Sequence, residues 1–253
     1  MRRCCIIIAY IICDIMGDIM LFDLLRNIRT GTQIEIWQIV VYILSSLAVI
    51  FLTMPVHEAA HAFTADRLGD RTARYQGRLS LNPFNHIDPV GAVCILLFGF
   101  GWARPVPVNP NNFKNPKGGM AVTALAGPVS NIIVALVSLF LMNAARAIII
   151  AAGISLSTVV LIILLFFNYI AQINVSLAVF NLIPIPPLDG SRLLTAVLPN
   201  RAYYKLMQYE RYFFIVLMAL LWTGILDIPL SYLSGAVLSG LNWLARLPFS
   251  ALF

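Results

Sequence analysis

Two histidines and a glutamate near the end of an apolar stretch have the spacing of a metal site. The segment MPVHEAAHAF contains His57, Glu58 and His61. On a helix, four residues advance about 400°, so the two imidazoles lie ~40° apart and ~6 Å along the axis. Both rings then share one face, where they can bind one tetrahedral zinc ion. The sequence therefore predicts a helical site for Zn²⁺.

Glu58 is placed to act as the catalytic base of this predicted site. It lies about 100° around the helix from His57, so it can reach a water on the metal without becoming a ligand. Zinc lowers the pKa of water that it binds towards ~7. A nearby carboxylate can accept the proton and pass it to a leaving amine. The pattern indicates metal-assisted hydrolysis of a peptide bond.

The position of the motif in the chain strengthens this interpretation. It ends an apolar stretch long enough to span a membrane, where an ionisable side chain costs about 2.5–3.5 kcal/mol at mid-depth and usually serves a function. The alternative is a span end whose polar residues reach the headgroups. That alternative predicts Lys, Arg or Trp at the boundary rather than two histidines around a glutamate, and is disfavoured.

A catalytic zinc needs a third protein ligand and an open position. Asp66 follows His61 by five residues, about 140° around the helix, and faces away if the helix continues. His86, in NPFNHIDP, and Asp189, in NLIPIPPLDGSRL, are the other candidates. Spacing alone does not separate these two.

The composition shows what must carry these residues. Of 253 residues, 60% are hydrophobic and 11% are charged, and the mean hydropathy is +0.87. A soluble domain carries about 25% charged residues, so lipid must solvate much of this chain. The net charge of +6 resides in short loops beside apolar spans, where orientation signals and lipid contacts occur. Nucleic acid is therefore not an expected partner, whereas the lipid bilayer is.

The apolar pattern predicts an all-α polytopic membrane protein with five to six transmembrane helices. Residues 92–100 are too short to cross and predict a re-entrant or membrane-dipping hairpin segment. The proline-rich stretch Trp102 to Pro116 predicts extended backbone. The spans are expected at about 34–63, 120–145, 156–182, 209–226 and 230–247.

The chain is expected to contain one membrane-embedded domain, residues 20–253. Residues 1–19 form an N-terminal extension of uncertain role, consistent with a mis-assigned start upstream of Met20. Most basic loop residues fall on one side of the predicted spans, which the positive-inside rule assigns to the cytoplasm. The site is thus expected nearer the cytoplasmic face of a bacterial inner membrane.

A resemblance orders the candidates for the third ligand. An HExxH motif that closes a span, followed downstream by NLIPIPPLDG, resembles the site-2 protease family of intramembrane zinc metalloproteases, in its compact bacterial branch without a PDZ domain. GRLSLNP, GWARPVPVNP and AGPVSN also resemble stretches of that branch. The resemblance implies His57, His61 and Asp189 as zinc ligands and Glu58 as the general base.

Other polar residues are candidates for supporting roles. The resemblance implies a role for Asn181, as a donor to the substrate carbonyl or to the tetrahedral oxyanion, although a helix-capping role is equally compatible with its position. Asn174 is expected to contact substrate or neighbouring helices. His86 and Asp88 are candidates either to orient a ligand imidazole or to stabilise their loop. Gly127-Pro128 predicts a helix start or a kink.

The expected function is hydrolysis of peptide bonds in transmembrane segments of other proteins. Trp102 to Pro116 is the candidate for binding an unwound substrate by strand-like pairing. The alternatives are a zinc-binding membrane scaffold without proteolysis and a metal transporter. A transporter would carry polar residues at mid-depth on several spans, whereas here they concentrate in two motifs. The oligomeric state is not predicted.

Overall fold

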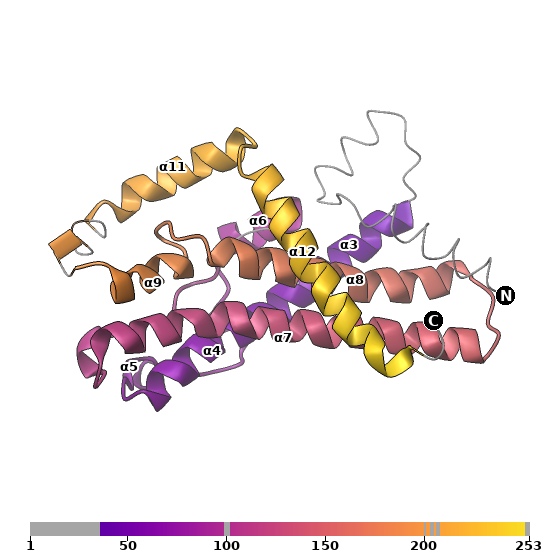
Figure 1. Ribbon diagram of the computed structural model, residues 1–253, viewed down its shortest axis with the longest axis horizontal. Helices are drawn as coiled ribbons and strands as arrows, with labels where there is room; N and C mark the ends of the chain where they lie inside the picture. The colour runs from indigo at the N-terminus through magenta and orange to yellow at the C-terminus, as the bar shows by residue number, and fades with distance from the viewer. Residues whose placement is uncertain (1–35, 99–101, 200, 203–204, 206–207, 251–253) are drawn as a thin grey trace.

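The computed structural model describes residues 36–250 apart from 99–101, 200, 203–204 and 206–207 (Figure 1). Over these residues every regular element is helical, as the composition predicts. The expected extension, residues 1–19, lies outside the described residues.

The first long helix carries the HExxH motif in its second half. It consists of α3 (Ile36–Ala48), the π-helical turn η1 (Val49–Thr53) and α4 (Met54–Arg67). Pro55 explains the wide turn, because proline has no N–H to donate and its ring collides with the carbonyl four residues earlier. In a regular α-helix the N–H of Met54 would donate to the carbonyl four residues back. Here it donates to the carbonyl of Val49, five residues back. The helix continues past the proline, and the motif emerges rotated relative to α3.

Two further long helices form the centre of the molecule. Helix α7 (Pro116–Ala151) begins after Asn115, whose side chain accepts a hydrogen bond from the N–H of Gly118. Helix α8 (Thr158–Asn181) begins after Ser157, which caps it in the same manner through Val160. These asparagine and serine caps satisfy N–H groups that have no partner within a helix. The two helices run antiparallel, side by side (Figure 1).

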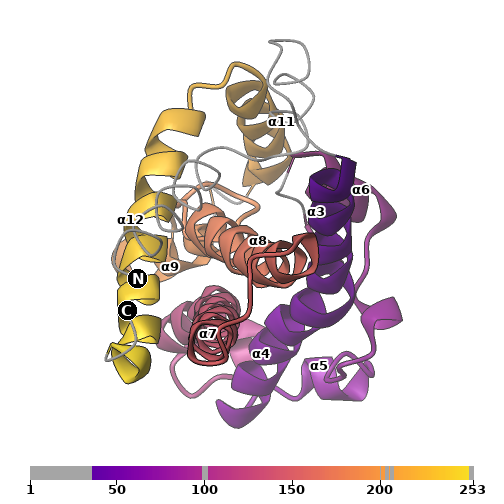
Figure 2. The same ribbon diagram turned by 90° about the vertical axis from the view of Figure 1, so that its right-hand side faces the viewer.

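Helix α8 is the most enclosed element. Viewed along its length, it is surrounded by α3, α7, α11 and α12 (Figure 2). One apolar cluster joins it to α3 and η1 and includes Val41, Tyr42, Val49, Tyr169 and Ile173. A second joins it to α7 and α12 and includes Ala135, Leu139, Ala171, Val175 and Ala245. The first helix is thereby fixed against the central pair.

Short elements connect these helices. After α4 come α5 (Thr72–Tyr75), the 3-10 turn η2 (Pro83–Asn85), α6 (Pro89–Phe98) and the 3-10 turn η3 (Pro110–Asn112). After α8 come α9 (Asp189–Val197), α11 (Glu210–Trp222), α12 (Asp227–Arg246) and the 3-10 turn η4 (Leu247–Phe249).

Three helices within the described residues are long and apolar enough to cross a membrane. They are Ile36–Arg67, Pro116–Ala151 and Thr158–Asn181, close to the first three expected spans. Helices α11 and α12 occupy the regions expected for the last two, but neither meets that criterion. The 13 residues of α11 reach only ~20 Å, against a hydrocarbon core of about 30 Å. The 10 residues of α6 reach ~15 Å, too short to cross, as expected for residues 92–100.

Helix α12 crosses α7 and α8 and is joined to α7 by a polar contact. The amide of Asn143, a fully buried side chain, donates to the side-chain oxygen of Asn242 over 3.1 Å. The same amide donates to the carbonyl of Leu139 in its own helix. A hydrogen bond between helices is one of the forces that can orient them in lipid.

We expect the Asn143–Asn242 pair to contribute a small interaction energy to the docking of α12. Such pairs in membranes average about 0.6 kcal/mol and reach about 1.7. A double-mutant cycle with Asn143→Ala and Asn242→Ala, followed by unfolding in mixed micelles, measures this coupling. Strictly additive effects of the two substitutions would show that the pair contributes nothing.

Candidate metal centre

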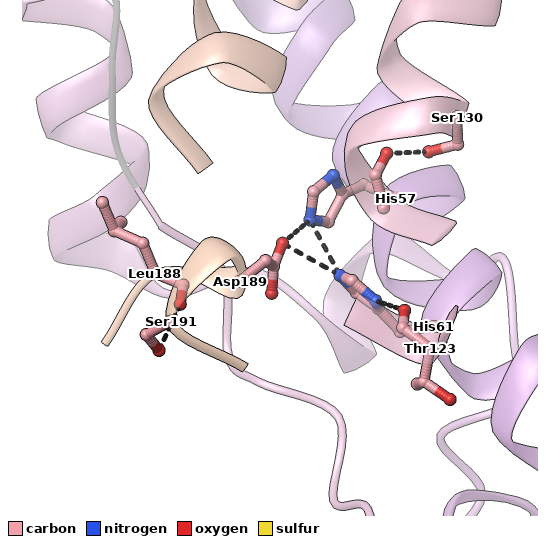
Figure 3. A network of polar contacts seen from close by, with 8 residues as sticks. His57, His61, Thr123, Ser130, Leu188, Asp189 and Ser191 are labelled. Carbon is pink, nitrogen blue, oxygen red and sulfur yellow. Dashed lines mark hydrogen bonds and ion pairs between the residues drawn. The ribbon is translucent and has the colours of Figure 1, made fainter. Parts of the chain in front are cut away.

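Three side chains from two distant parts of the chain converge on one point (Figure 3). The Nε2 atoms of His57 and His61 are 3.1 Å apart. The Oδ2 atom of Asp189 lies 3.2 Å from each of them. Both histidines project from α4, and Asp189 is the first residue of α9. The structure thus brings together residues 57, 61 and 189, which the resemblance grouped as ligands.

The spacing of these atoms fits a zinc ion. Zinc bonds of 2.0–2.1 Å in tetrahedral geometry place neighbouring ligand atoms about 3.3 Å apart. The observed separations of 3.1 and 3.2 Å agree with that value. Two imidazole nitrogens and one carboxylate oxygen are also the kind of ligand set found in catalytic zinc sites with an open position. No other group of three histidine, cysteine or acidic residues with this proximity occurs among the described residues.

The orientation of His61 is set by α7. Its Nδ1 donates to the backbone carbonyl of Thr123 over 2.7 Å, which directs Nε2 towards His57 and Asp189. Contacts of this kind fix the tautomer and the ring of a ligand histidine. The Nδ1 atom of His57 is buried and has no hydrogen-bond partner among the described residues.

Gly127 allows α7 to approach this closely. A Cβ atom built there would lie 2.5 Å from the Nε2 atom of His57 and closer still to that of His61. Atoms that are not bonded do not tolerate such distances, so any side chain at this position would displace the imidazoles. Small residues permit close contact between membrane helices, and here the contact is between a helix backbone and two ligand rings.

Asp189 reaches the site because the chain turns sharply after α8. Pro184, Pro186 and Pro187 end the helix, since proline cannot donate to the helical ladder. Gly190 then packs against the carbonyl oxygens of Leu182 and Ile183, leaving no space for a Cβ atom.

Helix α9 is fastened to the start of α7. The ammonium of Lys117 donates to the carbonyl of Leu198 over 3.1 Å, and the hydroxyl of Thr195 contacts the carbonyl of Lys117 at 3.4 Å. Because α7 also supplies Gly127 and Thr123, a single helix positions the ligand residues of both motifs.

Glu58 lies beside this cluster without joining it. Its side chain is buried, and it interacts electrostatically with His61 and with Arg78. The role of Glu58 as general base stays a prediction.

Two of the weaker candidates have local roles in their loop. The Nε2 atom of buried His86 lies 2.8 Å from the carbonyl of Ser80. The Asp88 carboxylate accepts from the N–H groups of Val90 and Gly91 at the start of α6. These contacts stabilise the loop, which is one of the two roles expected for these residues. Neither side chain has a described hydrogen bond to His57 or His61.

The remaining candidates are placed as follows. Asp66 forms an ion pair with Arg74 at 2.7 Å, away from the cluster. Asn174 is fully buried, and its amide donates to the carbonyl of Ile170 in its own helix. Asn181 is the last residue of α8 and is half-buried.

Sequence reasoning missed the contributions of Thr123 and Gly127. Gly127-Pro128 is expected to start or kink a helix; both residues lie inside α7, which excludes a start, and the kink stays a prediction. A glycine within a membrane helix is a usable signal of close approach. The sequence does not show which residues approach it, because they come from another helix.

We expect Gly127→Ala to abolish zinc binding. The new methyl group would overlap both ligand imidazoles, so zinc content should fall at least tenfold, the lower end of the roughly 10–100-fold loss seen when a residue supporting a metal site is removed. Elemental analysis of the purified protein measures this. Gly235→Ala is the matched control, because a Cβ atom at that glycine of α12 meets no atom within 4 Å. Full zinc content in Gly127→Ala would contradict the packing described here.

Comparisons of the sequence with known proteins find relatives named as zinc metalloproteases. The pattern of Peptidase family M50 matches residues 143–224. A Bacillus subtilis (strain 168) protein named "Putative zinc metalloprotease YwhC" is 42% identical over 174 residues, which cover 69% of this chain and 78% of that protein. A Mycolicibacterium smegmatis protein named "Putative zinc metalloprotease Rip2" is 28% identical over 185 residues, or 70% of this chain and 66% of that protein. No solved structure matches the chain.

The similarity to the Bacillus protein covers most of both chains. Together with three apolar helices long enough to cross a bilayer, it identifies an integral membrane protein with zinc as its cofactor. These relatives give no support to a transporter or to a scaffold without proteolysis. The chain belongs to Peptidase family M50, the site-2 protease family, and is a zinc metalloprotease.

Proposed function

We propose that this enzyme is an intramembrane protease that hydrolyses peptide bonds within or near transmembrane segments of other membrane proteins. In this proposal His57, His61 and Asp189 hold the zinc ion, and Glu58 is the general base. The observation that carries it is the convergence of the three ligand atoms within 3.2 Å of one another beside a buried glutamate. The ligand helix is continuous with an apolar helix of membrane-spanning length.

A zinc ion held by His57, His61 and Asp189 would supply Lewis acidity for the scissile carbonyl and for the attacking water. The Glu58 carboxylate accepts the proton of the attacking water and then donates it to the leaving amine nitrogen. Burial of Glu58 removes competing water from this carboxylate. Thr123 and Gly127 keep the imidazoles in place while the proton moves.

A transmembrane substrate must unwind before it can react. Within a helix, each carbonyl accepts a hydrogen bond from the N–H four residues later, which blocks its approach to the site. The stretch Trp102 to Pro116 is proposed to bind the unwound substrate as an extended strand. Its residues from 102 to 109 form no helix, and they follow the short helix α6.

We also propose how the chain lies in the membrane. Residues 20–253 form one embedded domain with five to six spans. The site faces the cytoplasm of a bacterial inner membrane, because the loop beyond α4 is strongly basic. That loop and the ends of α4 and α5 carry Arg67, Arg71, Arg74 and Arg78.

The experiment that tests this function compares the wild-type enzyme with Glu58→Gln on a labelled single-span substrate in proteoliposomes. We expect Glu58→Gln to lose cleavage by about 10²–10⁴-fold, the usual contribution of a general base, while retaining zinc. His57→Ala should lose zinc as well. Asp66→Asn, which removes a carboxylate from the same helix, should stay within about twofold, because Asp66 pairs with Arg74 and is not part of the three-residue cluster.

Equal cleavage by the wild-type enzyme and Glu58→Gln would overturn the assigned role of Glu58. Efficient cleavage of the same peptide in soluble form, with no cleavage of its membrane-spanning form, would overturn the intramembrane assignment.

Asn181 is proposed to donate a hydrogen bond to the oxyanion of the transition state. Removal of such a donor costs about 10²–10³ in kcat, so Asn181→Ala should lower kcat by that factor and leave KM little changed. Asn174→Ala is the comparison, because Asn174 is fully buried and bonded within its helix. An unchanged kcat in Asn181→Ala would leave this residue only the role of ending α8.

A further inference from the structure

The segment between Arg104 and Asn109 offers hydrogen-bond donors in an alternating pattern. Pro105 and Pro107 have no N–H, so Val106 and Val108 carry the donors between the two ends. Residues that precede proline favour extended backbone, and Asn109 is extended, with φ −106° and ψ 106°. In extended backbone, residues two apart present their N–H and C=O groups on the same side. The segment can therefore donate to a partner strand only along the side of Val106 and Val108, and Arg104 at the start of that side is already bonded to His86 and Arg78.

The backbone N–H groups of Val106 and Val108 donate no hydrogen bond to any described residue. Arg104, which precedes them, donates its N–H to the carbonyl of His86 over 2.7 Å. Two open donors on a held segment are what an unwound substrate strand needs for main-chain pairing.

Arg78 holds the beginning of the segment. Its guanidinium donates to the carbonyls of Arg104 and Pro105, the latter over 3.1 Å. It also donates to the carbonyl of Asn85 in the preceding loop. The planar guanidinium thus connects two separate loop segments. The ammonium group of lysine, a point charge, cannot reproduce these contacts.

Asp70 holds the end of the segment. It is fully buried, and its Oδ2 accepts from the N–H of Asn109 over 2.6 Å. Its Oδ1 accepts from the side-chain amide of Asn112 over 2.7 Å and from the N–H and hydroxyl of Thr72. A buried carboxylate stays charged when donors surround it in this way.

Both holding residues come from the chain that immediately follows the ligand helix. Asp70 lies three residues beyond the end of α4 at Arg67, and Arg78 follows α5. Arg78 also interacts electrostatically with Glu58. The segment is therefore bonded at both ends to the stretch of chain that follows the helix carrying His57, Glu58 and His61.

We propose that Asp70 and Arg78 are positioning residues that hold Pro105–Val108 as a one-sided edge for the substrate strand, in fixed register with the metal helix. This inference rests on the proposed function, in which that segment binds substrate. An edge held in place before binding spares the substrate the entropy of ordering it. Loss of either residue should therefore weaken substrate binding more than it slows the chemical step.

The test measures kcat and KM for the full-length enzyme in proteoliposomes with a quenched fluorescent single-span substrate. Asp70→Asn and Arg78→Lys should each raise KM about tenfold, the loss expected from hydrogen bonds to a charged group. Both should keep zinc content and keep kcat within about twofold. The matched controls are Asp66→Asn and Arg74→Lys, which alter an ion pair between α4 and α5 that has no described hydrogen bond to residues 104–112.

Exchanging the carboxylate and the amide between positions 70 and 112 distinguishes two roles of Asp70. One role is to hold the segment, and the other is to stabilise the turn at Thr72. Asn112→Asp alone places two carboxylates together and should also raise KM. In the double variant Asp70→Asn/Asn112→Asp, the new amide can donate to the new carboxylate and its oxygen can still accept from Asn109. The bonds to Thr72 are not restored. Recovery of KM in the double variant is the expected result.

Each other outcome overturns a specific statement. Glu58-dependent cleavage with unchanged KM in both Asp70→Asn and Arg78→Lys would overturn this inference alone. A raised KM that the double variant does not recover would show that Asp70 serves the turn at Thr72 rather than the segment. Absence of Glu58-dependent cleavage by the wild-type enzyme would overturn the proposed function, and this inference with it. If Asp70→Asn does not fold, Arg78→Lys and Asn112→Ala make the same comparison.

Discussion

Three electron-pair donors held within 3.2 Å of one another in a largely buried place are the constraint on which this structure depends. Lone pairs this close repel one another unless a cation lies between them, either a metal ion or a proton carried by an imidazole. Much of the surrounding architecture serves this convergence. The carbonyl of Thr123 turns one ring, Gly127 makes room for both, and α9 is fastened to the helix that provides these two contacts.

The elements that position the site are those that interrupt regular helices. Pro55 widens the turn before the motif, and the prolines after α8 stop that helix and let the chain bring Asp189 back. Such interruptions leave backbone groups without partners, which lipid cannot satisfy. They are tolerated here where protein packs around them, as with Gly190 against the carbonyls of Leu182 and Ile183.

The sequence predicted local features well and contacts between helices poorly. Apolar length gave the three longest helices, and the four-residue spacing of His57 and His61 placed both rings on one face. Spacing could not decide whether His86 or Asp189 is the third zinc ligand, because the path of the intervening loops determines which distant residue lies near the motif helix. The family resemblance favoured Asp189. The role of Gly127 was also hidden, since a glycine identifies close approach without identifying the partner. The sequence suggested Trp102 to Pro116 as extended chain, but the contacts of Asp70 and Arg78 that hold it depend on tertiary structure.

The π-helical turn before the motif has a consequence for how such chains change in evolution. A π-helical turn contains one residue more than a regular turn. That residue sets the rotation between the lipid-facing side of α3 and the ligand-facing side of α4, so their observed relative orientation requires it. Replacement of Pro55 alone would favour a regular turn and leave the two faces about 100° out of register. A homologue without this proline should therefore also lack one residue upstream of its HExxH motif, so that the proline and the additional residue are inherited together.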